Sequence, residues 1–556
     1  MTLEGGMPSG ENPLGLRMTN DARKKLEKKR EKRGHPMFST KMSKAMLSAV
    51  LGTVLLVTGC GGGNSAGTDN GKAATTAPAS GKKVLNIGLK ADPPSMDPNT
   101  STSLYDRQVY ASLYDKLFDI DSEGKIVPML AESYEVTPDG KAYTLKLKQG
   151  VKFHDGTEFD AEAVKFNLER NMNGEKSRRK GELKFVDSVA VVDKHTVKIQ
   201  MKEPFAPFLS VLTDRSGIMV SPKAVKEHGD QYLNHPVGTG PFVFVEQVKG
   251  DHVTLKKNEN YWNGQVKLDE VNYKVFTNGT AKVQNLRSGM LDIIDDTPVK
   301  EIPAIKGDAN LQLVAESGMG YQGLYLNNSR APFDNKYLRQ AVDRAIDRDA
   351  LVKVLFNGYA APARTAFTKG SLAYNEALNT PKPPDAAEIK DFLAKGGQPN
   401  GFNFKLYIST SPENEQLGAV LQNMLKQHNI NVTLEKLEYG QLIETGDKGE
   451  FQAMQLGWSG RQDPDQNFHD FVVTDTSNND GRISIPKLDE LVTKARGELD
   501  EAKRKALYDE AAALLQEEAG YVYMYHQYVL LGMNKKVTGF TYVPDGLIRT
   551  ANLDKQ

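Results

Sequence analysis

Hydrophobic and polar residues alternate in two segments of the C-terminal half, and a helical pattern lies between them. Residues 402–408 (FNFKLYI) and 430–437 (INVTLEKL) carry an apolar side chain at every second position, which is typical of half-buried strands. Between the two segments, apolar residues recur at helical spacing: Leu417, Val420, Leu421, Met424 and Leu425. The pattern predicts a β-α-β unit.

A third strand should follow in the same sheet. A short helix near residues 440–446 (GQLIETG) leads to the apolar stretch 451–456 (FQAMQL). Strands joined by helices lie parallel with right-handed crossovers, and ligands of such sheets bind outside the carboxyl ends of the strands. Two loops occupy that edge, residues 409–414 (STSPEN) and 457–468 (GWSGRQDPDQNF).

Elements of both kinds also occur in the N-terminal half. VLNIGL at 84–89 is a short strand, and the alternating stretches YTLKLKQGVKF and HTVKIQM predict further strands. Between them Asp160 is a suitable N-cap for the helix AEAVKFNLER, with Val164 and Leu168 on its inner face. Strands and helices continue to the C-terminus without a detectable repeat, which predicts an α/β fold.

The loop after the third strand has the composition of a binding site. Trp458 offers a broad apolar face, and the glycines on either side of Trp458 and Ser459, Gly457 and Gly460, let the backbone approach a ligand closely. Ser459 is counted with them as a candidate ligand contact. Arg461 can hold a carboxylate through two parallel hydrogen bonds. These residues suit a small zwitterion or anion.

The two acids of this loop have two interpretations. Asp463 and Asp465 can accept hydrogen bonds from an ammonium group of a ligand. The alternative is that Asp-Pro-Asp forms a turn and that Trp458 belongs to the core.

Length and charge limit the classes of protein. A chain of 556 residues is too long for one core, so we expect at least two lobes. The net charge of zero hides an asymmetry, because residues 1–59 hold 11 basic and 5 acidic residues and leave 60 basic and 66 acidic residues downstream. A mildly acidic body argues against nucleic-acid binding.

A targeting segment precedes the folded part. Lys41 and Lys44 precede an apolar run that ends in VTGC, and the run is too short to span a bilayer. Cys60 is the only cysteine, so it forms no intrachain disulfide, and VTGC resembles the lipobox of bacterial lipoproteins. We therefore expect a lipoprotein signal at 42–60 with lipidation of Cys60; the alternative is an ordinary cleaved signal.

The segments on either side of this signal have no apolar pattern. We expect residues 1–41 to be a disordered or untranslated extension, and the low-complexity residues 61–83 to be a flexible tether.

Signatures of catalysis are missing from the sequence. The nine histidines include no HExxH pattern, and neither a phosphate-binding loop nor a dinucleotide fingerprint follows a strand. His469 adjoins the proposed cleft, but a single histidine is weak support for acid–base chemistry. We expect no enzyme, no cofactor and no metal site.

Several segments, in this order, resemble the family 5 extracellular solute-binding proteins of bacterial ABC transporters. They include PPSMDP, the run SLYDKLFDIDSEGKIVPMLAESYEVTPDGKAYTLKLKQGVKFHDGTEFDAEAVKF, PVGTGPFVF followed by VTLKKNENYWNG, FDNKYLRQAVDRAIDRDALV, and GWSGRQDPD. The resemblance covers residues from about 84 to 550. It implies a two-lobed, three-domain α/β fold of the periplasmic-binding-protein type (cluster C), with a hinged ligand cleft.

The resemblance also implies domain limits. Domain I would combine residues 84–128, 236–315 and 529–556, domain II would be residues 129–235, and domain III, which sets ligand specificity, would be residues 316–528. GTGP, at 238–241, would be structural and not a ligand contact.

The function implied by the resemblance is solute capture for an ABC importer. A monomer anchored by lipid on the outer face of the cytoplasmic membrane would bind a peptide or a similar small charged solute. It would deliver this solute unchanged to permease subunits that work with cytoplasmic ATPases. The alternatives are a peptide- or pheromone-sensing receptor and a binder of opine-like, acidic-sugar or metal-chelate ligands.

The sequence departs from the dipeptide binders of this family at two places. Those proteins hold the peptide's amino group with an aspartate after the Gly-Trp pair, and its carboxylate with an arginine at the end of the earlier strand. Here Arg461 stands at the first place, and Ser409 and Thr410 stand at the second. The departure favours a ligand with an anionic group.

Overall fold

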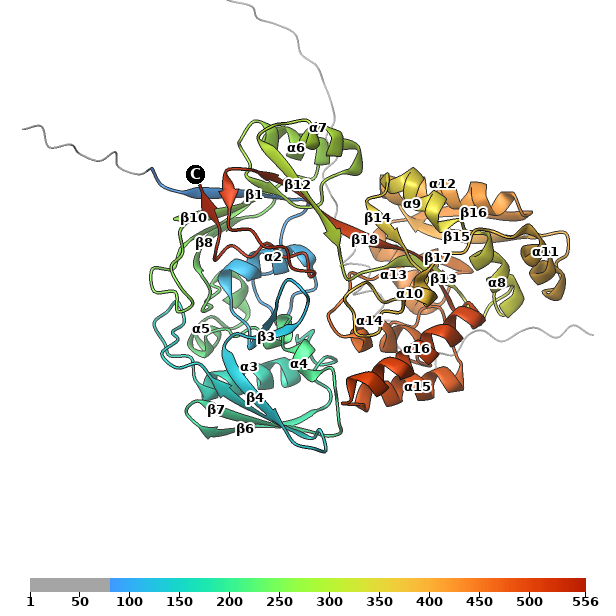
Figure 1. Cartoon of the computed structure of the whole chain (residues 1–556). Coiled ribbons are helices and arrows are strands. Elements are labelled where there is room, and N and C mark those ends of the chain that lie inside the picture. The colour runs from blue at the N-terminus through green and yellow to red at the C-terminus, as the bar shows by residue number, and fades with distance from the viewer. Residues whose placement is uncertain (1–80) are drawn as a thin grey trace, which may run out of the picture. The chain divides into compact units, whose positions relative to one another are not determined.

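A long path of paired strands runs through the computed structural model, which describes residues 81–556 (Figure 1). In order of pairing, its strands are β16 (Ile430–Leu437), β15 (Phe402–Ser409), β17 (Ala453–Gln455), β13 (Gln322–Leu326), β18 (Tyr521–Asn534), β11 (Ile293–Ile294), β1 (Val84–Leu89), β10 (Glu270–Val275), β9 (His252–Lys257) and β8 (Phe242–Val248). Two further strands pair with β18, namely β12 (Leu311–Ser317) and β14 (Ala360–Pro362).

A separate antiparallel sheet forms the core of the segment predicted as domain II. Its strands, in order, are β4 (Ala131–Val136), β5 (Ala142–Leu147), β7 (Thr196–Met201) and β6 (Val186–Asp193). Helix α3 (Ala161–Asn173) packs on it, and the Asp160 carboxylate accepts a hydrogen bond from the backbone N–H of Ala163. Val164 and Leu168 are fully buried, as their spacing predicted.

The β-α-β unit predicted between 402 and 437 is confirmed. β15 and β16 are parallel with Phe402 opposite Ile430, and α12 (Pro412–Lys426) connects them. Leu417, Leu421 and Leu425 are buried on its inner face. After α13 (Tyr439–Lys448) the third strand, β17, also runs parallel to β15, but it spans only three residues and not all of FQAMQL.

The remaining elements cover the sheets or connect them. The helices are α2 (Leu104–Leu113), α4 (Phe208–Val211), α5 (Pro222–His228), α6 (Gly279–Arg287), α7 (Ile302–Lys306), α8 (Lys336–Ala345), α9 (Arg348–Phe356), α10 (Glu376–Asn379), α11 (Ala386–Lys395), α14 (Pro464–Val472), α15 (Pro486–Gly497) and α16 (Glu501–Glu518). The short strands are β2 (Phe118–Ile120), β3 (Ile126–Pro128), β19 (Val537–Thr538) and β20 (Asp554–Lys555). Over residues 81–556, none of the helices has both the length and the apolar character needed to cross a bilayer.

Strand β18 joins the two halves of the long path. Its first residues pair with β13, where Tyr521 lies opposite Tyr325, and its last residues pair with β12, where Asn534 lies opposite Leu311. β12 and β18 lie side by side in Figure 1, and the chain continues from β12 into β13 through residues 318–321. Strand β18 and the segment 318–321 thus lie near the two limits predicted for domain III, residues 316 and 528. The domain limits themselves stay a prediction.

The GTGP segment has a structural role. A Cβ atom added at Gly238 would lie 2.3 Å from the carbonyl oxygen of Leu113, and one added at Gly240 would lie 2.5 Å from the carbonyl carbon of the same residue. The segment therefore lies directly against the end of α2, where only glycine fits.

Asp480 is a buried acid whose environment disfavours its charge. Its side chain lies against Gly446 near the C-terminal end of α13, where the helix dipole repels anions. Burial, reinforced by the neighbouring charge of Asp447, raises the pKa of Asp480 to about 6, although Arg482 opposes this.

We expect Asp480→Asn to stabilise the fold at neutral pH. Because the folded-state pKa is raised, the native protein binds more protons than the unfolded chain between the ordinary pKa and about 6, so stability falls as the pH rises through that window. At pH 7.5 the substitution should raise the free energy of unfolding by about 1 to 3 kcal/mol, and at pH 4 the gain should vanish. Urea unfolding at both pH values measures this, with exposed Asp475→Asn as the control. Equal gains at both pH values would contradict the electrostatic origin.

Candidate functional site

The loop after β17 is fixed to the connection between β12 and β13. The backbone N–H of Trp458 donates to the carbonyl of Tyr321 (2.9 Å), and the N–H of Tyr321 donates back to the carbonyl of Trp458 (3.0 Å). Gly460 has a left-handed backbone (φ 83°), and a Cβ atom there would lie 2.2 Å from the carbonyl carbon of Met319. The predicted close backbone approach at Gly460 is thus made to the protein's own connecting segment.

Asn467 holds the tip of this loop in shape. Its Oδ1 accepts from the indole Nε1 of Trp458 (3.0 Å) and from the backbone N–H of Arg461 (2.7 Å), while its Nδ2 donates to the carbonyl of Arg461 (2.7 Å). Sequence reasoning missed Asn467. Its hydrogen bonds reach the backbone of Arg461, six residues earlier in the chain, and no local sequence pattern indicates such contacts. Trp458 is half-buried and packs against Phe471, with ring centroids 5.1 Å apart.

Arg461 stacks on Trp458. Its guanidinium carbon lies 4.6 Å from the indole centroid, and its Nη1 donates to the carbonyl of Gly460 (2.6 Å) and to the hydroxyl of Ser459 (3.2 Å). Such cation–π stacking presents the remaining guanidinium donors in a defined plane. The four residues that the sequence grouped in this loop are therefore brought together.

The partner of Arg461 comes from a distant part of the chain. Its Nε lies 3.0 Å from Oδ2 of Asp214, and the Nε of Arg107 lies 3.0 Å from the other oxygen, Oδ1. Arg107 is on α2, Asp214 follows α4, and Arg461 precedes α14, so all three predicted domains contribute a charge here.

Burial and charge shift the pKa values in this cluster. Burial alone would raise the pKa of Asp214, but the guanidinium groups of Arg107, Arg215 and Arg461 hold it well below its usual value. Burial lowers the pKa of Arg461 to about 10, with Asp214 opposing the shift. Both groups stay ionised at neutral pH, so the pair is a true buried ion pair.

Two more arginines of the same region face this pair. Arg179 bonds through Nη1 to Glu182 and donates through Nη2 to the carbonyl of Ser101 (2.9 Å). Arg215 donates through Nη1 to the hydroxyl of Ser101 (3.3 Å), and its Nε lies 4.0 Å from Asp214. We call Arg107, Arg179, Arg215 and Arg461 the arginine cluster. Its first three members were not predicted from the sequence.

Asp463 and Asp465 have partners within the loop's own lobe. Asp463 caps α14 and receives two hydrogen bonds from Arg504 (2.7 and 2.6 Å), and Asp465 receives two from Arg496 (2.9 and 2.9 Å). Both carboxylates are buried. This arrangement favours the turn interpretation of the Asp-Pro-Asp segment, since both acids brace the loop against α15 and α16.

Ser409 and Thr410 lie at the carboxyl end of β15, on the same sheet edge as the loop. The Ser409 hydroxyl is buried and accepts from the side-chain amide of Asn414 (2.7 Å). Thr410 is exposed, and its hydroxyl donates to Glu438 (3.2 Å). Both residues therefore lie at the sheet edge where the sequence placed them. Their hydroxyl groups, however, are bonded to nearby side chains, Asn414 and Glu438. Cys60 lies outside the described residues.

A small cavity adjoins Arg461. Its volume is about 130 Å³, and its walls are residues 122–124 between β2 and β3, residues 317–319 and 368–371, Pro544, and the loop residues Arg461, Gln462 and Asn467. The cavity walls therefore come from segments before and after the connection between β12 and β13 in the sequence, and Arg461 forms part of one wall.

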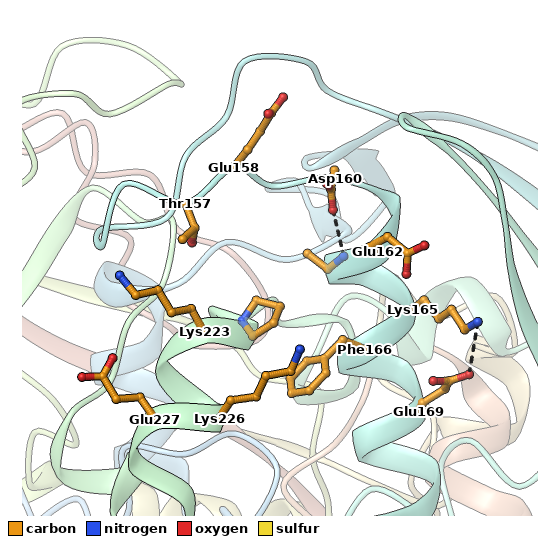
Figure 2. Close-up of a pocket in the computed structure, with 12 residues that line it drawn as sticks. Thr157, Glu158, Asp160, Glu162, Lys165, Phe166, Glu169, Lys223, Lys226 and Glu227 are labelled. Carbon is orange, nitrogen blue, oxygen red and sulfur yellow. Dashed lines mark hydrogen bonds and ion pairs between the residues drawn. The ribbon is translucent and has the colours of Figure 1, made fainter.

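A larger groove lies elsewhere, between α3 and α5 (Figure 2). It has a volume of about 760 Å³ and is lined only by residues 157–169 and 222–227. Asp160 is used to cap α3, Lys165 pairs with Glu169 (4.0 Å), and Lys226 lies over the ring of Phe166. Because the charges that line the groove are of both signs and several already have partners, we do not take this groove as the ligand site. Within residues 81–556, no three His, Cys, Asp or Glu side chains gather as a metal site would require.

Removing the acids that brace the loop should destabilise the protein. We expect Asp463→Asn and Asp465→Asn each to lower the free energy of unfolding by about 3 kcal/mol, because each leaves a buried arginine without its counter-charge. Chemical denaturation measures the loss, and exposed Asp475→Asn should change stability by less than about 0.5 kcal/mol. A wild-type unfolding curve for both loop variants would show that neither acid braces the loop.

Comparisons with known proteins agree on one family. Residues 125–480 match the family profile described as "Bacterial extracellular solute-binding proteins, family 5 Middle". The glutathione-binding protein GsiB of Pectobacterium atrosepticum is 32% identical over 473 residues, which are 83% of this chain and 92% of that protein.

Solved structures show the same fold. DppA from Helicobacter pylori, in complex with the peptide STSA, superposes with a TM-score of 0.74 at 27% identity and covers 85% of this chain and 98% of its own. AgaA from A. tumefaciens R10, in complex with agropinic acid, has a TM-score of 0.74 at 30% identity and covers 85% and 99%. The predicted two-lobed α/β fold is confirmed. This chain therefore belongs to the family 5 bacterial extracellular solute-binding proteins, whose role is to bind a solute for import.

Proposed function

We propose that this protein captures a small acidic or peptide-like solute between its lobes and delivers it to the permease of an ABC importer. The observation that carries the proposal is the meeting of Arg461, Asp214 and Arg107, which come from three separate parts of the chain. A buried charged contact made only where these parts meet is what a closing ligand site requires. The relatives support the ligand class, since their names give glutathione, a short peptide and agropinic acid.

The ligand would lie against the loop after β17. Arg461 would hold a carboxylate of the solute, and the indole of Trp458 would cover its apolar part. Ser459 and Gly460 would face it with hydroxyl and backbone groups, and Ser409 and Thr410 would limit its extent at the neighbouring strand end. Asp463 and Asp465 would act indirectly, by holding the loop in place.

Binding would be coupled to the closure of the lobes. Besides Arg461 and Asp214, the hydroxyl of Ser210 donates to Gln466 (2.9 Å), and the N–H of Ala206 donates to the carbonyl of Arg496 (3.0 Å). These polar contacts join the segments predicted as domains II and III. A ligand that binds the closed state better than the open one would shift the equilibrium toward closure, and the closed form would dock on the permease.

No chemical change of the solute is needed for this function. The family binds and releases its solutes, and we propose that this member is likewise a carrier and not an enzyme. It would act as a monomer on the outer face of the cytoplasmic membrane, held there by lipid on Cys60.

Arg461→Ala should weaken solute binding at least 30-fold, because the loss of one partner of a buried charge pair costs about 2 to 5 kcal/mol. Calorimetry with glutathione and a set of acidic di- and tripeptides, on the full-length protein in detergent, measures the change. Arg461→Lys keeps the charge but loses the planar donors, so it should give an intermediate loss. A change of less than threefold for Arg461→Ala would remove Arg461 from the site.

Cys60→Ser should release the protein from the membrane, because stable anchoring needs the acyl chains that a lipidated cysteine carries. Metabolic labelling with an alkyne fatty acid and cell fractionation measure this. Ser65→Ala, in the predicted tether, is the matched control and should remain labelled and membrane-bound. Membrane retention and label in the Cys60→Ser variant would refute the anchor.

A further inference from the structure

The arginine cluster carries more positive charge than the protein neutralises. Its four guanidinium groups face two carboxylates, Asp214 and Glu182, and this leaves an excess of two positive charges. The next acid, Asp106, has no direct ion pair with the cluster: it accepts a hydrogen bond from the hydroxyl of Ser101, and its interaction with Arg215 is outweighed by burial, which raises its pKa. Uncompensated charge in a buried site is costly, so a counter-ion is expected there.

Donor groups of the cluster are also unused. The side chains of Arg107, Arg179 and Arg215 are 9%, 4% and 5% exposed, and the Nε of each is inaccessible and has no hydrogen-bond partner. The Nε of Arg107 lies near Asp214 but is not aligned for a hydrogen bond. Buried donors of this kind are rare in native proteins unless a ligand satisfies them.

Other buried arginines of the chain behave differently. Arg496 and Arg504, and likewise the half-buried Arg549, each give two parallel hydrogen bonds to a carboxylate and leave no such Nε unpaired. The unused donors are therefore a property of this cluster and not of buried arginines in general.

Resting on the proposed function, we propose that the arginine cluster is a subsite for two carboxylate groups of the solute, so that the preferred ligand is a dicarboxylate such as an N-acyl or peptidyl glutamate or aspartate. Two charges of the ligand match the excess of two. The Asp214 carboxylate shows that the geometry suits a planar carboxylate, since Arg107 and Arg461 approach its two oxygens at the same distance of 3.0 Å.

The proposal assigns a role to each side of the cleft. Arg461 would bind the ligand from the loop after β17, while Arg107, Arg179 and Arg215 would bind it from the opposite side. Asp214 would act as a positioning residue that draws Arg107 and Arg461 together as the lobes close on the ligand. A ligand with one carboxylate would leave part of the excess charge unpaired and would bind less tightly.

The test compares two probes of the same shape. N-acetyl-Ala-Glu and N-acetyl-Ala-Gln differ by one negative charge, and calorimetry on the full-length protein in detergent should show at least 30-fold tighter binding of the glutamate form. Arg107→Gln and Arg179→Gln should reduce this ratio below about fivefold. Arg178→Gln, at the exposed neighbour of Arg179, should keep the ratio of the wild type. Thermal unfolding checks that each variant is folded.

The outcomes separate this inference from the proposed function. Equal binding of the two probes, with a loss of both in Arg461→Ala, would overturn the dicarboxylate subsite and leave solute capture intact. If neither probe binds, mass spectrometry of the solute that co-purifies from the native host tells how many carboxylate groups the natural ligand carries. A solute with two carboxylates supports the subsite, whereas a solute with fewer, or a phosphate ester, overturns it. Absence of any bound solute together with no ligand-dependent compaction in X-ray scattering would overturn both proposals.

Discussion

The carboxylate of Asp214 is the contact that joins three distant segments of the chain. Arg107 and Arg461 lie at its two oxygens, and neither arginine could approach the other so closely in a buried site without a negative charge between them. The structure of residues 81–556 therefore includes an internal anion where the segments meet. Under the proposed function, a solute that brings further negative charge would strengthen this contact. The charge balance where the segments meet would then couple binding to closure.

The loop that carries Arg461 is rigid because independent contacts hold it. Gly460 lies against the segment between β12 and β13, Asn467 bonds three groups of the loop, and Asp463 and Asp465 bond to arginines of α15 and α16. A loop held in this way moves with its lobe as one body. Opening at the connections between the lobes would then carry Arg461 away from Asp214 without any change within the loop.

Arginine has two roles in this protein, and its hydrogen-bond partners distinguish them. Arg496 and Arg504 use their donors on acids of the same lobe and so stabilise the local structure. Arg107, Arg179 and Arg215 are equally buried but keep donors unused. In the first role arginine secures a loop, and in the second, as we propose, it would offer its donors to an anion.

The sequence by itself determined the local elements, the family and the position of the loop after β17. The alternation in 402–408 and 430–437, the helical spacing from Leu417 to Leu425 and the Asp160 cap are short-range signals, and each corresponds to an observed element. Only the tertiary structure decided the partners of the charged residues. It joined Arg461 to Asp214, gave Asp463 to Arg504 and Asp465 to Arg496, and added Arg107, Arg179 and Arg215 to the site. The reason is physical, because periodicity reports which face of a helix or strand is buried, whereas an ion pair depends on which distant segments meet once the lobes have packed.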